Sequence, residues 1–305
     1  RENCDLVLLA GDIFDGPASR DSVEALYRAL EEMAVPVFIS PGNHDYVTPG
    51  SPWLEEKWPE NVHIFKGPLE SVTVPGLSCR VYGAGYTSMD CPGLLQGFRA
   101  EGEERWCVGV LHGDGVNHQS PYCPVTGRQV RESGLDYLAL GHNHSHGMFR
   151  SGETVWGWPG CPMGRGWDET GGKGIYLIHL EDRAEVRLLT LDLPRFHEMT
   201  VEGLPELEEA LPSGGNRDFY RVTLNGTGNE DLRPLLDRFP HMQIRDLRTS
   251  EVSLWDSAGE DTLEGLYFQL LRDTMKAGDE ETCRRARLAA EISRKLLEGR
   301  EVELP

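Results

Sequence analysis

The sequence lacks several features that mark common protein classes. It has no run of about 18 apolar residues, the shortest length that suits a transmembrane helix. Its start, RENCDLVLLAGD, is polar and then strand-like, which is not the pattern of a secretory signal. Internal repeats and low-complexity tracts are absent as well. We therefore expect a globular protein that has no membrane partner.

The cysteines form no recognisable framework. Seven are scattered along the chain, an odd number, and no two form a Cys-x-x-Cys pair. This pattern argues against a disulfide scaffold and against a zinc knuckle. It fits a reducing environment, so we expect a cytoplasmic protein. Each cysteine taken alone is expected to be a small core residue rather than a reactive thiol.

Positive charge is scarce. Only 30 Lys and Arg residues accompany 50 Asp and Glu residues, which gives a formal net charge of −20. An acidic surface repels nucleic acid and provides no long-range attraction toward it. This argues against a basic protein that coats DNA non-specifically. It does not exclude an enzyme that acts on nucleic acid, because bound divalent cations reverse the field at a site.

The 305 residues suffice for about two domains. Strand and helix signals alternate over residues 1–194, where apolar runs such as VPVFIS and LDYLAL end in polar residues. Runs of this kind are typical of central parallel strands in an α/β domain. A small β-α-β unit is predicted for residues 195–255, and a tail of two amphipathic helices for residues 256–305.

Four polar clusters directly follow apolar runs: GDIFD, GNHD, LHGD and GHNH. Because the carboxyl ends of parallel strands meet at one sheet edge, we expect these side chains to lie together. Carboxylate oxygen, amide oxygen and imidazole nitrogen are ligands suited to manganese, iron or zinc. The candidate residues are Asp12, Asp15, Asn43, His44, Asp45, His112, His142 and His144.

Each cluster alone also has a structural explanation. GDIFD fits a strand-end turn with a helix cap, and the polar residues of GNHD fit a turn. A single histidine such as His112 is often a hydrogen-bonded core residue. His142 and His144 would share a face on a continuing strand, which favours chelation. The joint occurrence of four clusters, each at a strand end, favours a metal site over separate structural roles.

The ordered set GD, GNHD, H and GHNH resembles the calcineurin-like metallophosphoesterases over about residues 5–193. The stretches SPWLEEKWPENVHIF and PGCPMGRGWDETGGKG, with the β-α-β unit that follows, resemble the SbcD-type DNA repair exonucleases, and most closely their YhaO-like bacterial branch. The resemblance implies a four-layer α/β sandwich core, a small α+β capping domain and a helical tail. It also implies hydrolysis of phosphodiesters by a DNA exonuclease.

The resemblance implies two divalent metal ions, for which manganese is expected and iron or zinc would also suit the ligands. Asp12 would bridge both ions. Asn43, His112 and His142 would bind the second ion, and His144 would bind the first. Two such ions lower the pKa of a water between them, and the hydroxide then attacks phosphorus.

The resemblance also implies catalytic roles for His44 and Asp45. His44 would face the scissile phosphate, stabilise its developing charge and give a proton to the leaving oxygen. Asp45 would orient His44 by accepting its other N–H group. Asp15 falls where SbcD-type nucleases often have a second histidine, so we do not expect leaving-group assistance from it.

One motif of the family is missing from the sequence. Such proteins begin with a strand that ends in an Asp-x-His pair, and no such pair precedes Asp12. We expect that pair, with the N-terminal strand, upstream of Arg1. If it is truly absent, the first ion loses two ligands, which would favour a binding subunit without activity of its own.

The partners expected from the resemblance are DNA ends and an SbcC-like ATPase subunit. Arginines of the capping domain either touch a DNA backbone or form a solvated face; they are Arg217, Arg221, Arg233, Arg238, Arg245 and Arg248. The tail stretch CRRARLAAEISRKLL either packs on the core or docks the ATPase. The sequence does not decide whether the protein forms a homodimer. The acidic charge favours an alternative, a phosphodiesterase for small substrates such as cyclic nucleotides.

Overall fold

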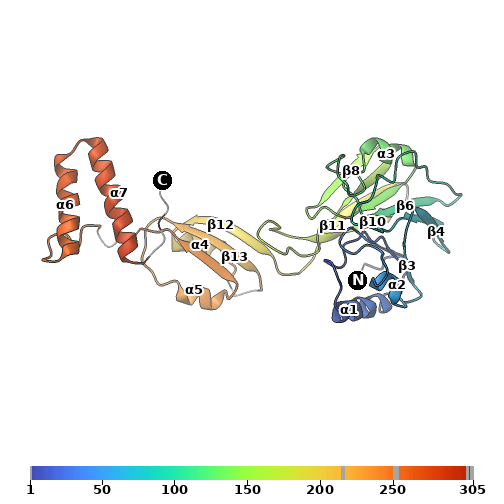
Figure 1. Ribbon diagram of the computed structural model, residues 1–305, viewed down its shortest axis with the longest axis horizontal. Coiled ribbons are helices and arrows are strands. Elements are labelled where there is room, and N and C mark those ends of the chain that lie inside the picture. Colours follow the sequence, from blue (N-terminus) through green and yellow to red (C-terminus); the bar gives the residue numbers. More distant parts are fainter. Residues whose placement is uncertain (1, 214–216, 250–253, 300–301, 303–305) are drawn as a thin grey trace. The chain divides into compact units, whose positions relative to one another are not determined.

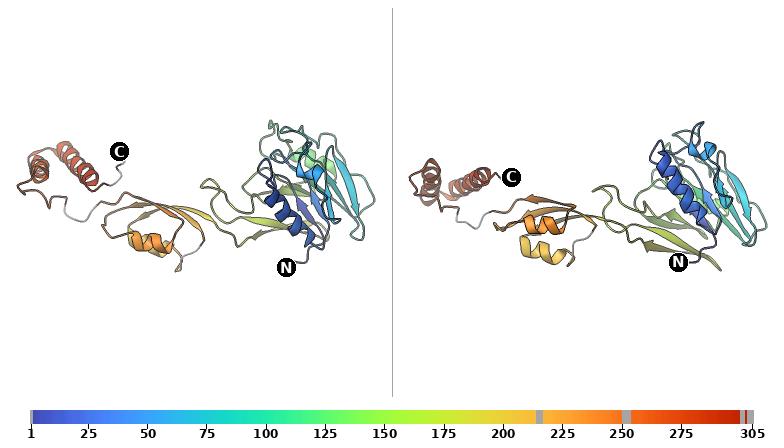
Figure 2. Two further views of the ribbon diagram at one scale, coloured as in Figure 1. Left: turned by 60° about the horizontal axis from the view of Figure 1, so that its bottom comes forward. Right: turned by 90° about the horizontal axis from the view of Figure 1, so that it is seen from below.

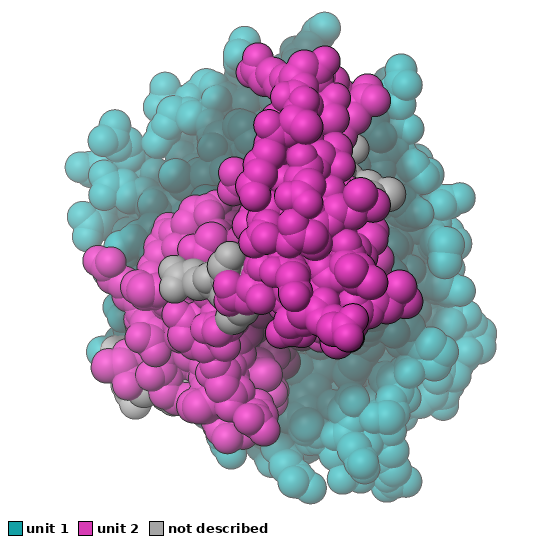
Figure 3. Space-filling view, turned by 90° about the vertical axis from the view of Figure 1, so that its left-hand side faces the viewer, with its two compact units in different colours: residues 1–163, 172–192 teal, residues 164–171, 193–305 magenta. Residues whose placement is uncertain are grey.

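The computed structural model describes residues 2–213, 217–249, 254–299 and 302. The chain divides into two compact units, coloured in Figure 3. Residues 1–163 and 172–192 form unit 1, and residues 164–171 and 193–305 form unit 2. None of the helices described in either unit is long and apolar enough to cross a membrane.

Unit 1 contains a three-stranded and a six-stranded sheet. The smaller sheet is parallel, in the order β1-β2-β3. The larger has the order β4-β5-β6-β7-β9-β8, with parallel central strands and an antiparallel strand at each edge. The strands are β1 Val7–Leu9, β2 Val37–Ile39, β3 Val62–Ile64, β4 Glu70–Val74, β5 Cys79–Gly83, β6 Trp106–Leu111, β7 Tyr137–Leu140, β8 Gly147–Ser151 and β9 Thr154–Trp158. A hairpin of β10 (Gly174–Leu180) and β11 (Ala184–Thr190) completes the unit.

Alternating side chains place a core on each face of the larger sheet. In β6, Val108 packs with Phe38 of β2 in the core between the two sheets, whereas Leu111 belongs to the core on the opposite face. That outer core is covered by α3 (Gly127–Ser133), and the outer face of the smaller sheet is covered by α1 (Arg20–Glu31). Figures 1 and 2 show α1 along the outside of unit 1. The predicted mixed α/β fold is confirmed, with helices outside two packed sheets.

A short helix, α2 (Pro52–Glu55), fixes the loop that follows β2. Its Trp53 is fully buried and stacks at a tilt against Phe14, with ring centroids 5.3 Å apart. The indole Nε1–H of Trp53 donates a hydrogen bond to the backbone carbonyl of Asp45. This anchor holds the GNHD segment against the loop that follows β1.

Unit 2 begins with a parallel sheet in the order β12-β13-β14. Its strands are β12 Phe196–Glu202, β13 Phe219–Asn225 and β14 Met242–Asp246, and its helices are α4 Leu204–Ala210 and α5 Arg233–Arg238. Both helices lie on one face of the sheet, as Figure 2 shows, over a core that includes Val222 and Leu224. This sheet adds β12 and α4 to the predicted β-α-β unit.

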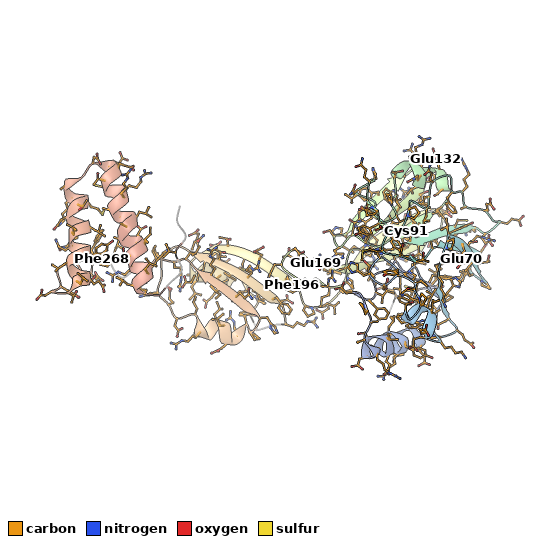
Figure 4. The ribbon with its side chains drawn as sticks, viewed as in Figure 1. Glu70, Cys91, Glu132, Glu169, Phe196 and Phe268 are labelled. Carbon is orange, nitrogen blue, oxygen red and sulfur yellow. The ribbon has the colours of Figure 1, made fainter. Side chains whose placement is uncertain are left out.

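The tail consists of α6 (Leu263–Ala277) and α7 (Glu280–Leu297), and the predicted helical tail is confirmed. Thr262 and Asp279 cap the two helices through their side-chain oxygens, and Gly278 lies between them. Phe268 is fully buried between the helices, labelled in Figure 4, with the Arg294 guanidinium 4.2 Å from its ring centroid. The predicted boundary after residue 255 stays a prediction, and residues 250–253 lie outside the described part.

Candidate metal centre

Loops at the ends of strands from both sheets of unit 1 meet at one place. Asp12 follows β1, and His112 and His142 follow β6 and β7. One ligand atom from each of these three residues lies within 4.8 Å of the others. Asn43, which follows β2, joins them: its Oδ1 is 2.9 Å from His112 Nε2 and 3.3 Å from His142 Nδ1. The structure therefore brings four of the predicted metal ligands together.

The hydrogen bonds of His112 fix its tautomer. Its Nδ1 lies 2.9 Å from the backbone oxygen of Ala10, which can only accept, so Nδ1 carries the proton. In the neutral ring, Nε2 then holds a lone pair. That nitrogen faces Asn43 Oδ1 and, at 3.3 Å, Asp12 Oδ2. These three atoms stay close together only with a positive centre between them, either a proton on Nε2 that is hydrogen-bonded to Asp12 or a metal ion that takes its place. The donor set therefore fits a divalent metal.

The pKa shifts of His142 and Asp12 favour the forms of these two residues that can bind a cation. Burial, followed by the nearby His112 ring, lowers the pKa of His142, which keeps its imidazole neutral and able to bind a cation. Burial alone would raise the pKa of Asp12, but its hydrogen bond with His112 and the neighbouring imidazoles lower it. Asp12 is therefore an anion at neutral pH, as a bridging ligand has to be.

The backbone at two of these ligands is left-handed. Asp12 has a φ of 51° and His142 a φ of 83°, values that residues other than glycine seldom adopt. Strain of this kind is held in place by surrounding structure and gathers at functional sites. Here the hydrogen bonds around both loops keep the two side chains directed at the cluster.

Close packing around His112 requires glycine at two neighbouring positions. A Cβ on Gly42 would lie 2.7 Å from His112 Nδ1 and 2.3 Å from Asp12 Oδ1. A Cβ on Gly141 would lie 1.7 Å from the backbone oxygen of Ala10 and 2.8 Å from His112 Nδ1. These glycines therefore serve the close approach of the loops to His112.

Asp45 has a different role from the predicted one. Its carboxylate accepts backbone N–H groups from Gly42 at 2.7 Å, Ile13 at 2.9 Å, and Asp12 and Phe14 at 3.3 Å. Burial raises the pKa of this carboxyl. The prediction that Asp45 orients His44 is wrong, because its oxygens hold the loop after β1 against the loop after β2.

The carboxylate beside His44 is that of Asp15. His44 Nδ1 lies 3.0 Å from Asp15 Oδ1, and both side chains are more than half exposed. The backbone N–H of His44 donates to Asp12 Oδ1 at 2.9 Å, which places the imidazole next to the predicted ligands. With Nδ1–H directed at Asp15, Nε2 is the nitrogen that remains to meet a substrate oxygen.

Among the described residues, His144 is not one of the three whose ligand atoms are grouped within 4.8 Å of one another. It is exposed. Its backbone oxygen accepts the N–H of Cys161 at 3.1 Å. The role of His144 as a ligand of the first metal stays a prediction.

Three residues near the cluster were not predicted. Asp114 is buried, and its Oδ2 lies 3.9 Å from His142 Nε2. Tyr122 packs on the His142 ring, and Tyr86 packs edge-on against His112. The LHGD motif contains Asp114 and offered a signal for it, but nothing in the local sequence marks the tyrosines.

Comparisons with known proteins agree with this geometry. Residues 1–146 match the family described as calcineurin-like phosphoesterase. The chain is also 34% identical over 195 residues to a protein of Bacillus subtilis (strain 168) named uncharacterized metallophosphoesterase YhaO. That match covers 59% of this chain and 46% of the relative, so the chain spans about half of the relative's length. Residues 1–146 are thus similar to calcineurin-like phosphoesterases, and three of the residues that could hold a metal ion lie within that range.

Proposed function

We propose that this protein is a metal-dependent DNA exonuclease that acts at DNA ends in repair, as an SbcD-like nuclease subunit. The observation that carries the proposal is one juxtaposition in unit 1. The candidate cation ligands around His112 Nε2 lie beside the His44–Asp15 pair. The backbone N–H of His44 connects the two groups by donating to Asp12 Oδ1 at 2.9 Å. Cation ligands next to an imidazole directed by a carboxylate suit hydrolysis of a phosphodiester.

The metal proposed for this site is manganese, bound as two ions, although the ligands also suit iron or zinc. Asp12, Asn43, His112 and His142 are the residues that would hold the second ion, and Asp12 and His144 would hold the first. When bound, divalent cations supply Lewis acidity and offset the repulsion between an acidic protein and a phosphodiester. Asp12 contributes the negative charge of the set, while the neutral ligands Asn43, His112 and His142 leave net positive charge for the substrate.

His44 is proposed to act on the substrate. Its Nδ1–H donates to Asp15, which fixes the ring and stabilises the imidazolium form. The proton on Nε2 then moves to the leaving oxygen as the P–O bond breaks. Asp45 takes no part in this transfer, and it acts by keeping the loops of Asp12 and Asn43 in register.

DNA as the substrate is supported by the SbcD-like stretches of the sequence and by the presence of a second unit. The surface of that unit needs one correction. Arg248 is only 2% exposed and pairs with Asp246 at 3.0 Å and with Glu230, so its interpretation as a contact to DNA is wrong. Arg221 pairs with Glu198 at 3.6 Å and stacks over Trp167, but its side chain is 43% exposed and stays a candidate.

An SbcC-like ATPase is proposed to dock on the tail through leucines rather than arginines. On α7, Arg284 and Arg285 both pair with Glu281, so much of the basic charge is already neutralised. On α6, Leu263, Leu266 and Leu270 are 87%, 61% and 65% exposed. Their spacing of three and four residues puts them on one face of the helix. A pull-down by such an ATPase that survives Leu266→Ser with Leu270→Ser would eliminate this site.

Two alternatives differ in substrate or in activity. The net charge of −20 favours a phosphodiesterase for small substrates such as cyclic nucleotides, which need no extended basic surface. The same cation site would serve that reaction. The second alternative is a subunit without activity of its own.

The test compares two substrates with one pair of variants. Linear duplex DNA and a small phosphodiester are each incubated with the full chain and manganese. His44→Ala removes the proposed proton donor, and His179→Ala on the exposed face of β10 is the matched control. We expect degradation of DNA from its ends that requires manganese and falls about 10²–10⁴-fold in His44→Ala but not in His179→Ala.

The other outcomes decide between the alternatives. Cleavage of the small diester without degradation of DNA supports the small-substrate enzyme. If neither substrate reacts with manganese, iron or zinc, the nuclease proposal fails and a non-catalytic subunit is favoured.

A further inference from the structure

Cys91 and Cys123 are joined through their backbones in the loops beside the metal centre. The N–H of Cys91 donates to Pro121 O at 2.9 Å, and the N–H of Cys123 donates to Cys91 O at 2.7 Å. These bonds form an isolated parallel bridge between Cys91 and Tyr122. The Cys91 thiol donates to the backbone oxygen of Pro92 at 3.5 Å, and neither cysteine is in a disulfide. Two distant parts of the sequence therefore place two cysteines on directly bonded backbone segments.

The geometry suits a disulfide. A disulfide needs Cα atoms about 4.4–6.8 Å apart, and the 2.7 Å bond from the N–H of Cys123 to the oxygen of Cys91 brings the two backbones close together. Cys123 is fully buried, whereas Cys91 is half-buried, so a reagent in solution reaches the pair through Cys91. Cys123 also has a left-handed backbone, with a φ of 45°. Such strain is unusual for a cysteine that only fills space in a core.

The segment that contains Cys123 also contacts the surroundings of the predicted metal ligand His142. Tyr122, next to Cys123, packs on the His142 ring with centroids 4.9 Å apart. The N–H of Asp114 donates to the backbone oxygens of Tyr122 at 2.9 Å and Cys123 at 3.2 Å. A change in the position of Cys123 therefore moves two of the groups that surround His142.

We propose that Cys91 and Cys123 form a redox-sensitive pair, which a low-molecular-weight disulfide of the glutathione type converts to a disulfide, and that this cross-link weakens cation binding at the centre. Cys91 first loses its thiol proton and attacks one sulfur of the external disulfide. The external S–S bond breaks, and the departing half takes up a proton and leaves as a thiol.

The second step closes the cross-link. Cys123 loses its proton and attacks the Cys91 sulfur of the mixed disulfide, and the remaining external half leaves as a second thiol. Two protein thiols are thus oxidised while one external disulfide is reduced. The new S–S bond, about 2.05 Å long, ties the loops of Cys91 and Cys123 together through their side chains.

The test begins with chemistry that does not require activity. The full chain is incubated with oxidised or reduced glutathione without metal, then unfolded, alkylated and digested with trypsin for mass spectrometry. We expect the peptides of Cys91 and Cys123 to become cross-linked in oxidised glutathione and to separate again after reduction. Cys91→Ser abolishes the cross-link, and Cys283→Ser, on α7, leaves it intact.

The metal readout then tests the coupling. Calorimetric titration with manganese is expected to show roughly tenfold weaker binding for the cross-linked chain, the size of effect typical of displaced partners around a metal ligand. In Cys91→Ser the oxidant leaves manganese affinity unchanged.

Each negative result has a separate meaning. If exposed Cys4 forms a mixed disulfide but no cross-linked peptide appears, the thiol-pair proposal is overturned. If the cross-link forms and manganese affinity is unchanged, the coupling is overturned. The cross-linking test does not rest on the proposed function. The titration does, because it assumes the proposed cation site. If manganese does not bind even the reduced chain, that result counts against the cation site and not against the thiol pair.

Discussion

His44 and Asp15 form a pair, with Nδ1 of the imidazole 3.0 Å from Oδ1 of the carboxylate. Asp15 comes from the loop after β1, and His44 comes from the loop after β2. Three hydrogen bonds to Asp45, from the N–H groups of Asp12, Ile13 and Phe14, hold the two loops together, so the pair depends on that junction. This relationship gives Asp15 a role in orienting His44 that the sequence did not predict.

Asp15→Asn tests whether the pair supports proton transfer. We expect a loss of roughly tenfold in kcat, because the neutral amide orients the ring without stabilising its charged form. The loss is expected to be larger for an alkyl leaving group than for nitrophenolate, which departs without a proton. Steady-state kinetics with both diesters measures this, with Asp21→Asn in α1 as the control. Equal losses with both leaving groups would contradict the role in proton transfer.

His142→Ala tests the cation ligands. The variant removes one imidazole from a set whose donor atoms lie within 4.8 Å, so we expect manganese affinity to fall more than about 100-fold. Calorimetric titration of the folded variant measures the affinity, and circular dichroism confirms that it is folded. His179→Ala should bind manganese like the unaltered chain. Equal affinity in both variants would remove His142 from the ligand set.

Asp45→Ala tests the role of Asp45 as a structural link. The substitution leaves four backbone N–H groups without their acceptor, and each buried unpaired donor costs about 1–3 kcal/mol. Since partial rearrangement relieves some of them, we expect the free energy of unfolding to fall by about 3–5 kcal/mol. Urea denaturation measures this, and an Asp21→Ala variant serves for comparison. A fully stable but inactive Asp45→Ala variant would instead support the catalytic role first predicted.

Gly141→Ala tests the close approach beside His112. The new Cβ would lie 1.7 Å from Ala10 O, so the loops after β1 and β7 have to separate. We expect destabilisation of at least about 1–3 kcal/mol, as for other overpacked sites, together with weaker manganese binding. Gly67→Ala is the matched control, because a Cβ added at Gly67 would meet nothing within 4 Å. Thermal unfolding of both variants measures the destabilisation. Equal melting temperatures would show that the two loops can separate without loss of stability, which would contradict the prediction.

Glu104 gives unit 1 a pH-dependent contribution to stability. Its hydrogen bonds with Arg80, 2.8 Å and 2.9 Å long, lower its pKa to about 2 from 4.5. Because the folded-state pKa is the lower one, the contribution is complete above pH 4.5 and is lost as the pH falls toward about 2. The stability difference between the unaltered chain and Glu104→Gln should therefore shrink over that interval. Urea unfolding at several pH values measures it, and a constant difference would contradict the assigned shift.

The sequence predicted the elements with strong periodicity. The two amphipathic helices of the tail follow the predicted pattern, and Gly278 lies between them. In α1, the hydroxyl of Ser19 caps the helix by accepting the N–H of Ser22 at 3.1 Å. By contrast, β4 (Glu70–Val74) was not predicted, because a half-exposed edge strand carries no apolar run. The short helix α3 was missed as well, although Thr126 and Gln129 form its capping box.

The residues that make up the candidate site were easier to predict from the sequence than the hydrogen bonds between them. Asp12, Asn43, His112 and His142 are marked by type and by position after apolar runs, and the topology then brings them together. Whether Asp15 or Asp45 serves His44 depends on the direction of each side chain, which changes with loop conformations such as the left-handed backbone of Asp12. Motif spacing contains no information about that direction.

The contact between His112 and the carbonyl of Ala10 spans 102 positions of the chain. Contacts of such long sequence separation form late in folding, because a large loop has to close before they contribute. The cluster has no local nucleus, since its members are spread from Asp12 to His142 and belong to two different sheets. A partly synthesised or clipped chain that ends before β7 therefore lacks His142 and has no assembled centre. Cation binding can stabilise the fold only after the chain has extended past β7 and the two sheets have come together.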